Sequence, residues 1–221
     1  MSVLLVQPPP ADHQSMADRA YRRIREAIIT LELPPGSVIS ESDLQSRLGF
    51  GRTPIREALR TLAGERLIEV YPRRGMFVAG VDARDLRAVS EVREQLEPFA
   101  ARLAAQRRTP EQVGHLTALI ADLDALGADP SSRALIELDQ RSHQQVYACA
   151  HNDFLVSVLD EHYVHALRIW LLALDRVPNL PQAVAEHRAI LAAIRDSDPD
   201  RAAMVMGAHV RDFEAKMRQW L

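Results

Sequence analysis

Apolar residues recur at helical spacing in the first third of the chain, and two short β-rich runs follow them. Helices are expected over residues 17–32, 41–48 and 54–65, and strands over residues 67–71 and 76–81. Leu33-Pro34-Pro35-Gly36 ends the first helix, because proline cannot continue the helical hydrogen bonds. Ser40 is expected to cap the second helix. Residues 72–75 are expected at the tip of a hairpin between the strands.

From residue 81 onward, the pattern is helical throughout. Proline, glycine and capping residues divide this part into six predicted helices, over residues 82–107, 110–126, 132–150, 153–175, 182–197 and 199–219. Short connections between helices favour antiparallel neighbours, so we expect an all-α antiparallel bundle over residues 81–221. One apolar stripe of its first helix holds Leu86, Val89, Val92, Leu96, Phe99 and Leu103.

The third predicted helix has two distinct faces. Its apolar face consists of Ile55, Leu59 and Leu62, and a second face carries Arg52, Arg56 and Arg60. Thr53 is expected as its N-cap, with Pro54 at the first helical position. A DNA-reading helix needs an apolar side that holds it to its domain and an outward arginine row. An arginine row is often only a solvated face. Here the preceding helix and the arginine-bearing hairpin favour DNA contact.

Residues 16–80 therefore predict a winged helix-turn-helix domain, with Arg73 and Arg74 in its wing. The stretch resembles the GntR family of transcription regulators. The resemblance is carried by Leu33-Pro34-Pro35-Gly36, Ser40-Glu41-x-x-Leu44, Leu48-Gly49, the run from Arg52 to Leu59, and Arg74-Gly75. It implies that Arg52 and Arg56 contact the groove and phosphates and that Gly75 lets the wing tip approach the DNA. Together with Thr53 and the basic hairpin residues Arg73 and Arg74, these are the candidate DNA-contacting residues.

Composition restricts the possible classes of protein. Hydrophobic residues make up 47% of the 221, which argues against wholesale disorder. Net charge is +2 over residues 1–80 and −5 over the remainder, a mild asymmetry in the direction that DNA binding requires. The single Cys149 excludes an intrachain disulfide and fits the cytoplasm. We expect no membrane span and no signal peptide, and residues 1–15 are expected to be a disordered tail.

Four residues of the predicted bundle could converge on a metal ion. Asp139 and His143 stand four apart on one helix, and His187 and His209 lie on two others. One carboxylate and three imidazoles suit Zn²⁺, Ni²⁺, Mn²⁺ or Fe²⁺, of which we prefer zinc. For any single histidine, a solvated or hydrogen-bonded structural role is the alternative.

The bundle resembles the FCD domain, the effector-binding half of FadR-like GntR regulators, in its six-helix, VanR-like form. The matching stretches are Val92-Arg93-x-x-Leu96-Glu97, Asp139-x-x-x-His143, Asn152, Glu186-His187-Arg188-Ala189-Ile190, Asp198 and Ala208-His209. The resemblance implies that Asp139, His143, His187 and His209 bind a divalent metal that helps to hold a small organic acid.

Two arginines are candidates for binding the effector's carboxylate. Arg93 lies on an otherwise apolar bundle face, and a bidentate carboxylate would satisfy its guanidinium. The alternative is an intrachain ion pair with Glu97, four residues on. Arg168 is the second candidate, with a solvated helix face as its alternative.

Together these features predict a cytoplasmic DNA-binding regulator, and a repressor rather than an enzyme. We expect a homodimer, formed through the bundle, on a palindromic double-stranded operator. A small carboxylate or sugar acid would modulate operator binding. A metal-dependent hydrolase and a DNA binder with a purely structural metal remain alternatives.

Overall fold

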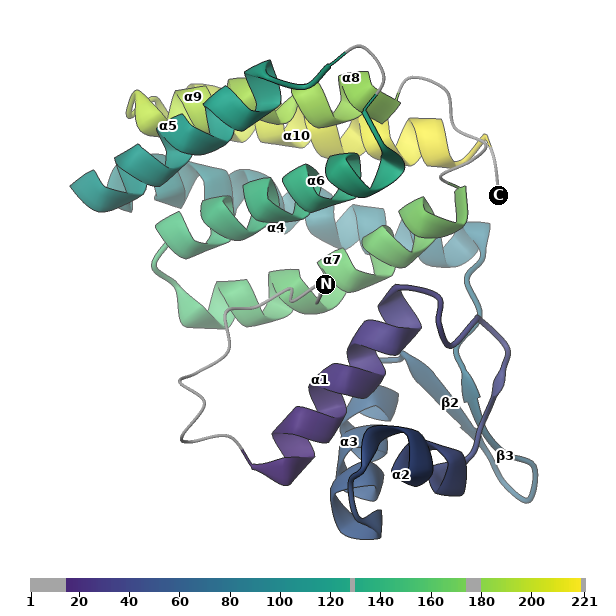
Figure 1. Ribbon diagram of the computed structural model, residues 1–221. Coiled ribbons are helices and arrows are strands. Elements are labelled where there is room, and N and C mark those ends of the chain that lie inside the picture. The colour runs from purple at the N-terminus through teal and green to yellow at the C-terminus, as the bar shows by residue number, and fades with distance from the viewer. Residues whose placement is uncertain (1–14, 128–129, 174–179, 220–221) are drawn as a thin grey trace. The chain divides into compact units, whose positions relative to one another are not determined.

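The computed structural model describes residues 15–127, 130–173 and 180–219 (Figure 1). The chain divides into two compact units, and the boundary between them in the sequence lies between Asp82 and Ala83. The first holds three helices and a small sheet, and the second is helical. The expected fold class, mainly α with a winged helix-turn-helix followed by an all-α domain, is therefore confirmed. Of the expected tail, only Ser15 is described, and it caps the first helix through Asp18.

The first unit is built on three helices, α1 (Met16–Ile29), α2 (Glu41–Leu48) and α3 (Arg52–Gly64). The expected apolar face of α3 is buried, and it packs against α1, whose Ile24 and Ile28 are also buried. α1 ends at Ile29 rather than at residue 32, because Leu31 turns the backbone to a φ of 61°. Ser40 caps α2 as expected by accepting the N–H of Asp43.

The expectation that Thr53 caps α3 is wrong. The helix begins at Arg52, and Gly51 is its N-cap, with extended backbone and no side-chain cap bond. Pro54 is tolerated there because the N–H groups of the first helical turn have no intrahelical acceptor. Thr53 is therefore an exposed residue of the first turn.

The sheet has three described strands, where the sequence pattern predicts two. β2 (Ile68–Tyr71) and β3 (Gly75–Val78) form the expected hairpin, and β1 (Val38–Ile39) adds to the other side of β3 in the order β1-β3-β2. A strand of two residues is too short to show an alternating pattern, which is why the sequence did not predict it.

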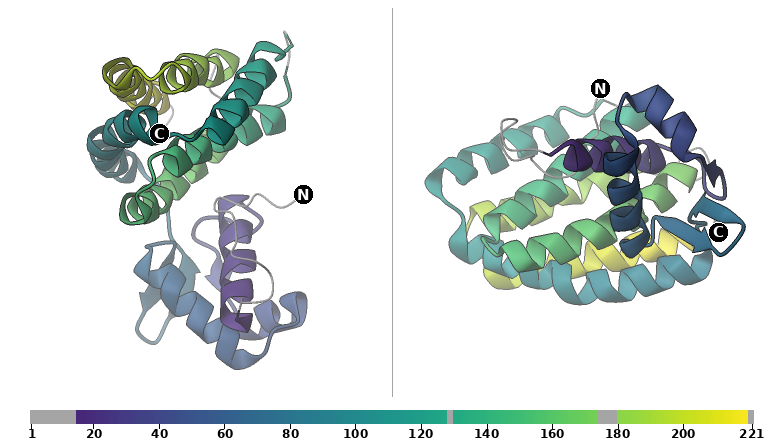
Figure 2. Two further views of the ribbon diagram at one scale, coloured as in Figure 1. Left: turned by 90° about the vertical axis from the view of Figure 1, so that its left-hand side faces the viewer. Right: turned by 90° about the horizontal axis from the view of Figure 1, so that it is seen from below.

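In its described residues, the second unit forms helices and no strand (Figure 2). Its described elements are α4 (Ala83–Arg107), α5 (Pro110–Asp124), α6 (Ser132–Cys149), α7 (Asp153–Ala173), α8 (Leu180–Ala185), α9 (His187–Arg195) and α10 (Pro199–Met217). α4 packs against α6, α7, α9 and α10, so it is the central element. α10 passes close to α4 at Gly207, where an added Cβ would come into van der Waals contact with Pro98 Cγ at 3.4 Å.

The single helix expected over residues 182–197 is interrupted, so the expected six helices become seven helical segments in the described part of the bundle. Glu186 separates α8 from α9. At this point the Val184 carbonyl accepts a hydrogen bond from Nδ1 of His187 at 3.0 Å. A side chain that competes for a helical carbonyl disturbs the helix locally, and periodicity does not reveal such competition.

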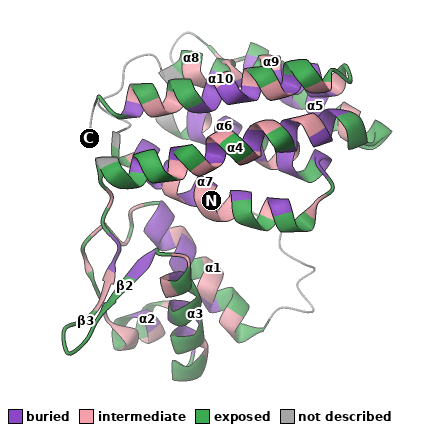
Figure 3. Ribbon diagram, turned by 180° about the vertical axis from the view of Figure 1, so that it is seen from behind, coloured by how far each residue is buried: buried purple, intermediate pink, exposed green. Residues whose placement is uncertain are grey.

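The expected apolar stripe of α4 is only partly buried (Figure 3). Leu86 and Leu103 lie in the core, but Val89, Val92 and Leu96 are half-buried and Phe99 is 48% exposed. The helix instead turns Arg93 and Glu97 inward. This rotation places polar groups at the centre of the bundle, where the candidate site lies.

Candidate metal centre and nucleic-acid interface

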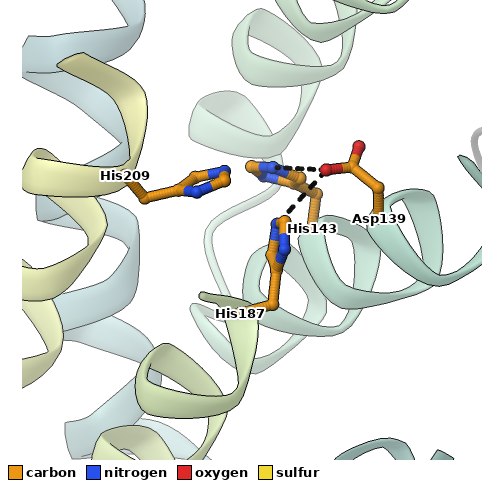
Figure 4. A group of neighbouring side chains, drawn as sticks. All are labelled: Asp139, His143, His187 and His209. Carbon is orange, nitrogen blue, oxygen red and sulfur yellow. Dashed lines mark ion pairs between the residues drawn. The ribbon is translucent and has the colours of Figure 1, made fainter. Parts of the chain in front are cut away.

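Four predicted ligands converge at the centre of the bundle (Figure 4). Asp139 and His143 come from successive turns of α6, His187 from the first residue of α9, and His209 from α10. All four are buried, and one ligand atom from each lies within 4.8 Å of the others. The structure thus brings together all four residues that the sequence proposed as ligands.

The nitrogen atoms that face this centre suit a cation. Nε2 of His187 lies 3.4 Å from Oδ1 of Asp139, and Nε2 of His143 lies 3.9 Å from the same oxygen. Nε2 of His187 is buried and has no hydrogen-bond partner among the described residues. A buried ring nitrogen without a partner costs free energy, and a divalent metal would remove that cost. The donor set therefore fits the ion that the resemblance implies.

Burial sets the protonation of these ligands. It lowers the pKa of His143 and of His187 well below the usual 6.5, so both imidazoles are neutral near pH 7 and retain the lone pair that a metal needs. Burial also raises the pKa of Asp139 to about 6, although the hydrogen bond from Tyr163 opposes this shift. At neutral pH the carboxylate is therefore mostly ionised, and metal binding competes with few protons.

A small cavity of about 10 Å³ adjoins the cluster, room for about one water molecule. Its lining includes His143 and His209 together with Arg93, Trp170 and Phe213. The indole Nε1 of Trp170 is buried and has no hydrogen-bond partner in the part of the chain described.

The two candidate clamp residues differ in their surroundings. Arg93 lines the cavity, but its Nε donates to Glu97 at 2.6 Å, which is the intrachain pair named as the alternative. Its guanidinium also lies over the rings of Tyr163 and Phe213. Arg168 does not lie on a solvated face, because it is almost fully buried. Burial lowers the pKa of Arg168 to about 10 against the opposing field of Asp85, and the residue is not part of the cavity lining.

The proposed DNA-contacting residues lie on exposed surfaces of the first unit. The side chains of Arg52 and Arg56 are 73% and 62% exposed. Both point towards Glu41 of α2, whose carboxylate lies 3.8 Å from Nε of Arg52 and 3.3 Å from Nε of Arg56. One glutamate thus holds two arginines on the same side of α3.

The hairpin tip exposes its two arginines and Gly75. Arg73 has a φ of 64° and Gly75 a φ of 101°, so the backbone turns through the left-handed region twice in three residues. The guanidinium of Arg74 stacks on the ring of Tyr71 at 5.8 Å. The tip is therefore a compact, positively charged projection.

Comparison with known proteins identifies both units. Residues 16–78 match the model of bacterial regulatory proteins of the gntR family, and residues 88–212 match the FCD domain. The galactonate operon transcriptional repressor of Escherichia coli K12 is 31% identical over 209 residues, covering 84% of this chain and 89% of that protein. The chain belongs to the GntR family.

Other relatives agree with this assignment. The Nta operon transcriptional regulator of Aminobacter aminovorans is 30% identical over 185 residues, covering 83% of this GntR regulator and 85% of its relative. The solved structure of E. coli McbR/YncC superposes with a TM-score of 0.76 at 20% identity, over 93% of this chain and 98% of that one. At this identity the likeness shows the fold.

Membership in the family makes this chain a GntR-type transcriptional regulator with an FCD domain. GntR regulators bind DNA operators, and FCD domains bind small-molecule effectors and metal ions. None of the helices that the structure describes is long and apolar enough to cross a membrane.

Sequence reasoning missed several residues around the FCD site. Tyr163 donates to Oδ2 of Asp139, Glu186 accepts from His209, and Trp170 and Phe213 line the cavity. Aromatic and acidic residues on amphipathic helices carry no distinctive spacing. The one available signal was the Glu186-His187 dipeptide. It places a carboxylate next in sequence to a candidate metal ligand, and therefore near the predicted site.

Loss of one imidazole is expected to abolish tight metal binding. Wild-type protein stripped with EDTA should bind one Zn²⁺ per chain and melt at a higher temperature when reloaded. His187→Ala should lose both effects, because it removes a fully buried nitrogen ligand. His115→Ala, which changes an exposed histidine of α5, is the matched control and should behave as wild type. Metal analysis and thermal unfolding measure the outcome. Zinc binding by His187→Ala at wild-type affinity would contradict the assignment.

Proposed function

We propose that this GntR regulator is a repressor whose operator binding is controlled by a small organic acid bound beside a metal ion in its FCD domain. The observation that carries the proposal is the buried Asp139, His143, His187 and His209 cluster, with Arg93 in the lining of the adjoining cavity. The galactonate and Nta operon regulators, by their names, control single operons, and they support a role of this kind. As a DNA-binding protein of bacteria, the regulator would act in the cytoplasm.

The four cluster residues would hold the metal, which we take to be zinc because nitrogen ligands dominate. A divalent ion held there supplies a Lewis-acidic anchor for an anionic oxygen. Within the same lining, Arg93 offers guanidinium N–H groups and Trp170 an indole N–H. These donors favour an acceptor-rich ligand, such as a carboxylate or a hydroxy acid.

The size of the cavity suggests how binding could be transmitted. Pockets that enclose a small organic ligand usually measure about 300 Å³ or more, whereas this one offers about 10 Å³. A sugar acid can enter only if part of the lining moves, and that lining includes Trp170 of α7 and Phe213 of α10. Ligand binding would therefore favour a different packing of these helices. Differential affinity for two packings is what an allosteric response requires, with a coupling of about 1–3 kcal/mol.

The same small volume favours a second candidate, a DNA binder in which the metal is only structural. A metal without further ligand needs no larger space than the cavity provides. The hydrolase alternative has no comparable support, because the relatives are transcriptional regulators.

We also propose a homodimer that uses the outer faces of α4 and α7 (Figure 3). These two helices pack side by side. Phe99 of α4 is 48% exposed, and Phe154 and Val158 of α7 are 90% and 40% exposed. A second copy would cover this apolar face and place two winged units on the two halves of a palindrome.

The dimer face can be tested by a single charge. Phe99→Glu should convert the dimer to a monomer at micromolar concentration, because a carboxylate would be buried in an apolar interface. Met204→Glu alters an exposed apolar residue of α10 and should leave the dimer intact. Light scattering gives both masses. A dimeric Phe99→Glu protein would place the interface elsewhere.

Arg56→Ala is expected to weaken operator binding by about 5- to 150-fold, the effect of about 1–3 kcal/mol, because it removes a major-groove or phosphate contact. An operator selected from a random duplex pool would serve as the probe. Titrations at several salt concentrations should show a shallower slope if Arg56 contacts phosphate. Arg87→Ala, which changes an exposed arginine of α4, is the control. Equal affinities for both variants would remove Arg56 from the DNA interface.

The effector proposal predicts a metal-dependent thermal shift. Among small carboxylates and sugar acids, galactonate included, at least one should raise the melting temperature of the zinc-loaded protein and not of the EDTA-treated protein. Arg93→Lys keeps the charge opposite Glu97 but loses the bidentate fork, so it should lose the acid-induced shift and keep the zinc-induced one. Arg87→Lys should keep both.

The acids that shift the melting temperature should also change operator affinity at fixed metal and salt. If EDTA lowers the melting temperature and no acid changes either quantity, the metal is structural and the effector proposal fails.

A further inference from the structure

Each ligand of the metal cluster is oriented by a second group behind it. Oδ2 of Asp139 accepts the hydroxyl hydrogen of Tyr163, which leaves Oδ1 facing the centre. Nδ1 of His187 donates to the Val184 carbonyl at 3.0 Å, since a carbonyl can only accept. This bond fixes the tautomer of His187 and leaves its Nε2 lone pair for the centre.

Carboxylates take this place behind the other two histidines. Nδ1 of His209 lies 3.2 Å from Oε2 of Glu186, and Oε1 of the same carboxylate accepts from Lys216 at 3.0 Å. Nδ1 of His143 lies 3.5 Å from Oε2 of Glu97, and Oε1 of that carboxylate accepts from Arg93 at 2.6 Å and from Tyr147 at 2.9 Å.

The two arrangements share one pattern. In each, a cationic side chain occupies one oxygen of a glutamate and a histidine Nδ1 faces the other. Oε2 of Glu97 is buried and has no hydrogen bond among the described residues, so the nearby Nδ1–H of His143 is the donor that would satisfy it.

We propose that Glu97 and Glu186 are positioning residues for the metal centre, which hold His143 and His209 as Nδ1–H tautomers with Nε2 free to bind the ion. This inference rests on the metal binding in the proposed function. A carboxylate behind a metal-binding imidazole fixes the orientation of the imidazole ring and raises its basicity. Loss of such a carboxylate typically lowers metal affinity by about 10- to 100-fold.

Substitution by glutamine tests the proposal because the amide has a direction. In Glu97→Gln, the amide oxygen must face Arg93, which can only donate. The NH₂ group then faces Nδ1 of His143 and favours the opposite tautomer, whose proton occupies Nε2. In Glu186→Gln, Lys216 has the same directing effect, and NH₂ faces His209.

The experiment measures Zn²⁺ affinity of the full chain by competition with a chromophoric chelator. Glu97→Gln should weaken binding by about 100-fold, because the new NH₂ group faces Nδ1 of the buried His143 and leaves it without its carboxylate acceptor. Glu186→Gln should weaken it by about 10-fold, because Glu186 is partly exposed and water can substitute there. Glu91→Gln, an exposed residue of the same helix as Glu97, is the matched control and should leave the affinity unchanged.

Nitrogen-15 spectra of the histidine rings separate positioning from a general loss of stability. In the metal-free wild type, His143 and His209 should carry the proton on Nδ1. Glu97→Gln should move it to Nε2 in His143 alone, and Glu186→Gln should do so in His209 alone. Tyr147→Phe tests the other neighbour of His143, since the Tyr147 hydroxyl lies 3.4 Å from Nδ1. It should leave the tautomer of His143 unchanged.

Each outcome is decisive. Folded glutamine variants with wild-type zinc affinity, or weakened variants with unchanged tautomers, would overturn the inference while leaving the proposed function intact. If Glu97→Gln does not fold, the inference is tested with Glu186→Gln, whose side chain is partly exposed. If the wild type itself binds no zinc, the proposed function fails first and the inference fails with it.

Discussion

The buried ion pair between Arg93 and Glu97 is the constraint on which the arrangement of the FCD domain depends. Its two side chains are almost completely buried on α4, with 2.6 Å between Nε and Oε1. Removing either partner would leave an uncompensated charge in the core, at a cost of about 3–5 kcal/mol. Burial of this pair requires α4 to turn its polar side inward. The helix therefore directs much of its apolar stripe outward, where Phe99 is exposed.

The orientation of α4 about its own axis thus links three properties of the molecule. The inward face of α4 supplies Arg93 to the cavity and Glu97 to the region behind His143. The outward face provides an apolar surface suited to a second copy. Packing density makes these properties interdependent, since a ligand that displaces Phe213 disturbs the ring on which Arg93 rests. This interdependence is a physical basis for the proposed response to an effector.

In the winged unit, positively charged side chains are exposed and yet held in place. Glu41 lies within ion-pair distance of both Arg52 and Arg56 and restrains them without burying them. Exposed ion pairs of this kind contribute little to stability, about 0–1 kcal/mol. If these arginines contact DNA as proposed, phosphates would replace Glu41 at small cost. Because the two guanidinium groups are already restrained in the free protein, they would lose less conformational entropy on binding DNA.

Sequence alone determined the helices, the hairpin and the identities of the four metal-ligand candidates, because periodicity, capping residues and residue chemistry are local properties. It also identified the exposed arginines of α3 by their spacing. The interruption at Glu186, the short β1 strand and the start of α3 at Arg52 were missed. The first depends on the hydrogen bond between His187 and Val184, the second is too short to show a pattern, and the third has no side-chain cap to mark it. Only the tertiary structure decided that Arg93 pairs with Glu97, that Arg168 is buried away from the cavity, and that Glu97 and Glu186 stand behind two of the histidines. The Arg93–Glu97 pair lies within α4, whereas the pairs of Glu97 with His143 and of Glu186 with His209 join elements distant in sequence. In each case packing makes the choice among competing partners, which no single segment encodes.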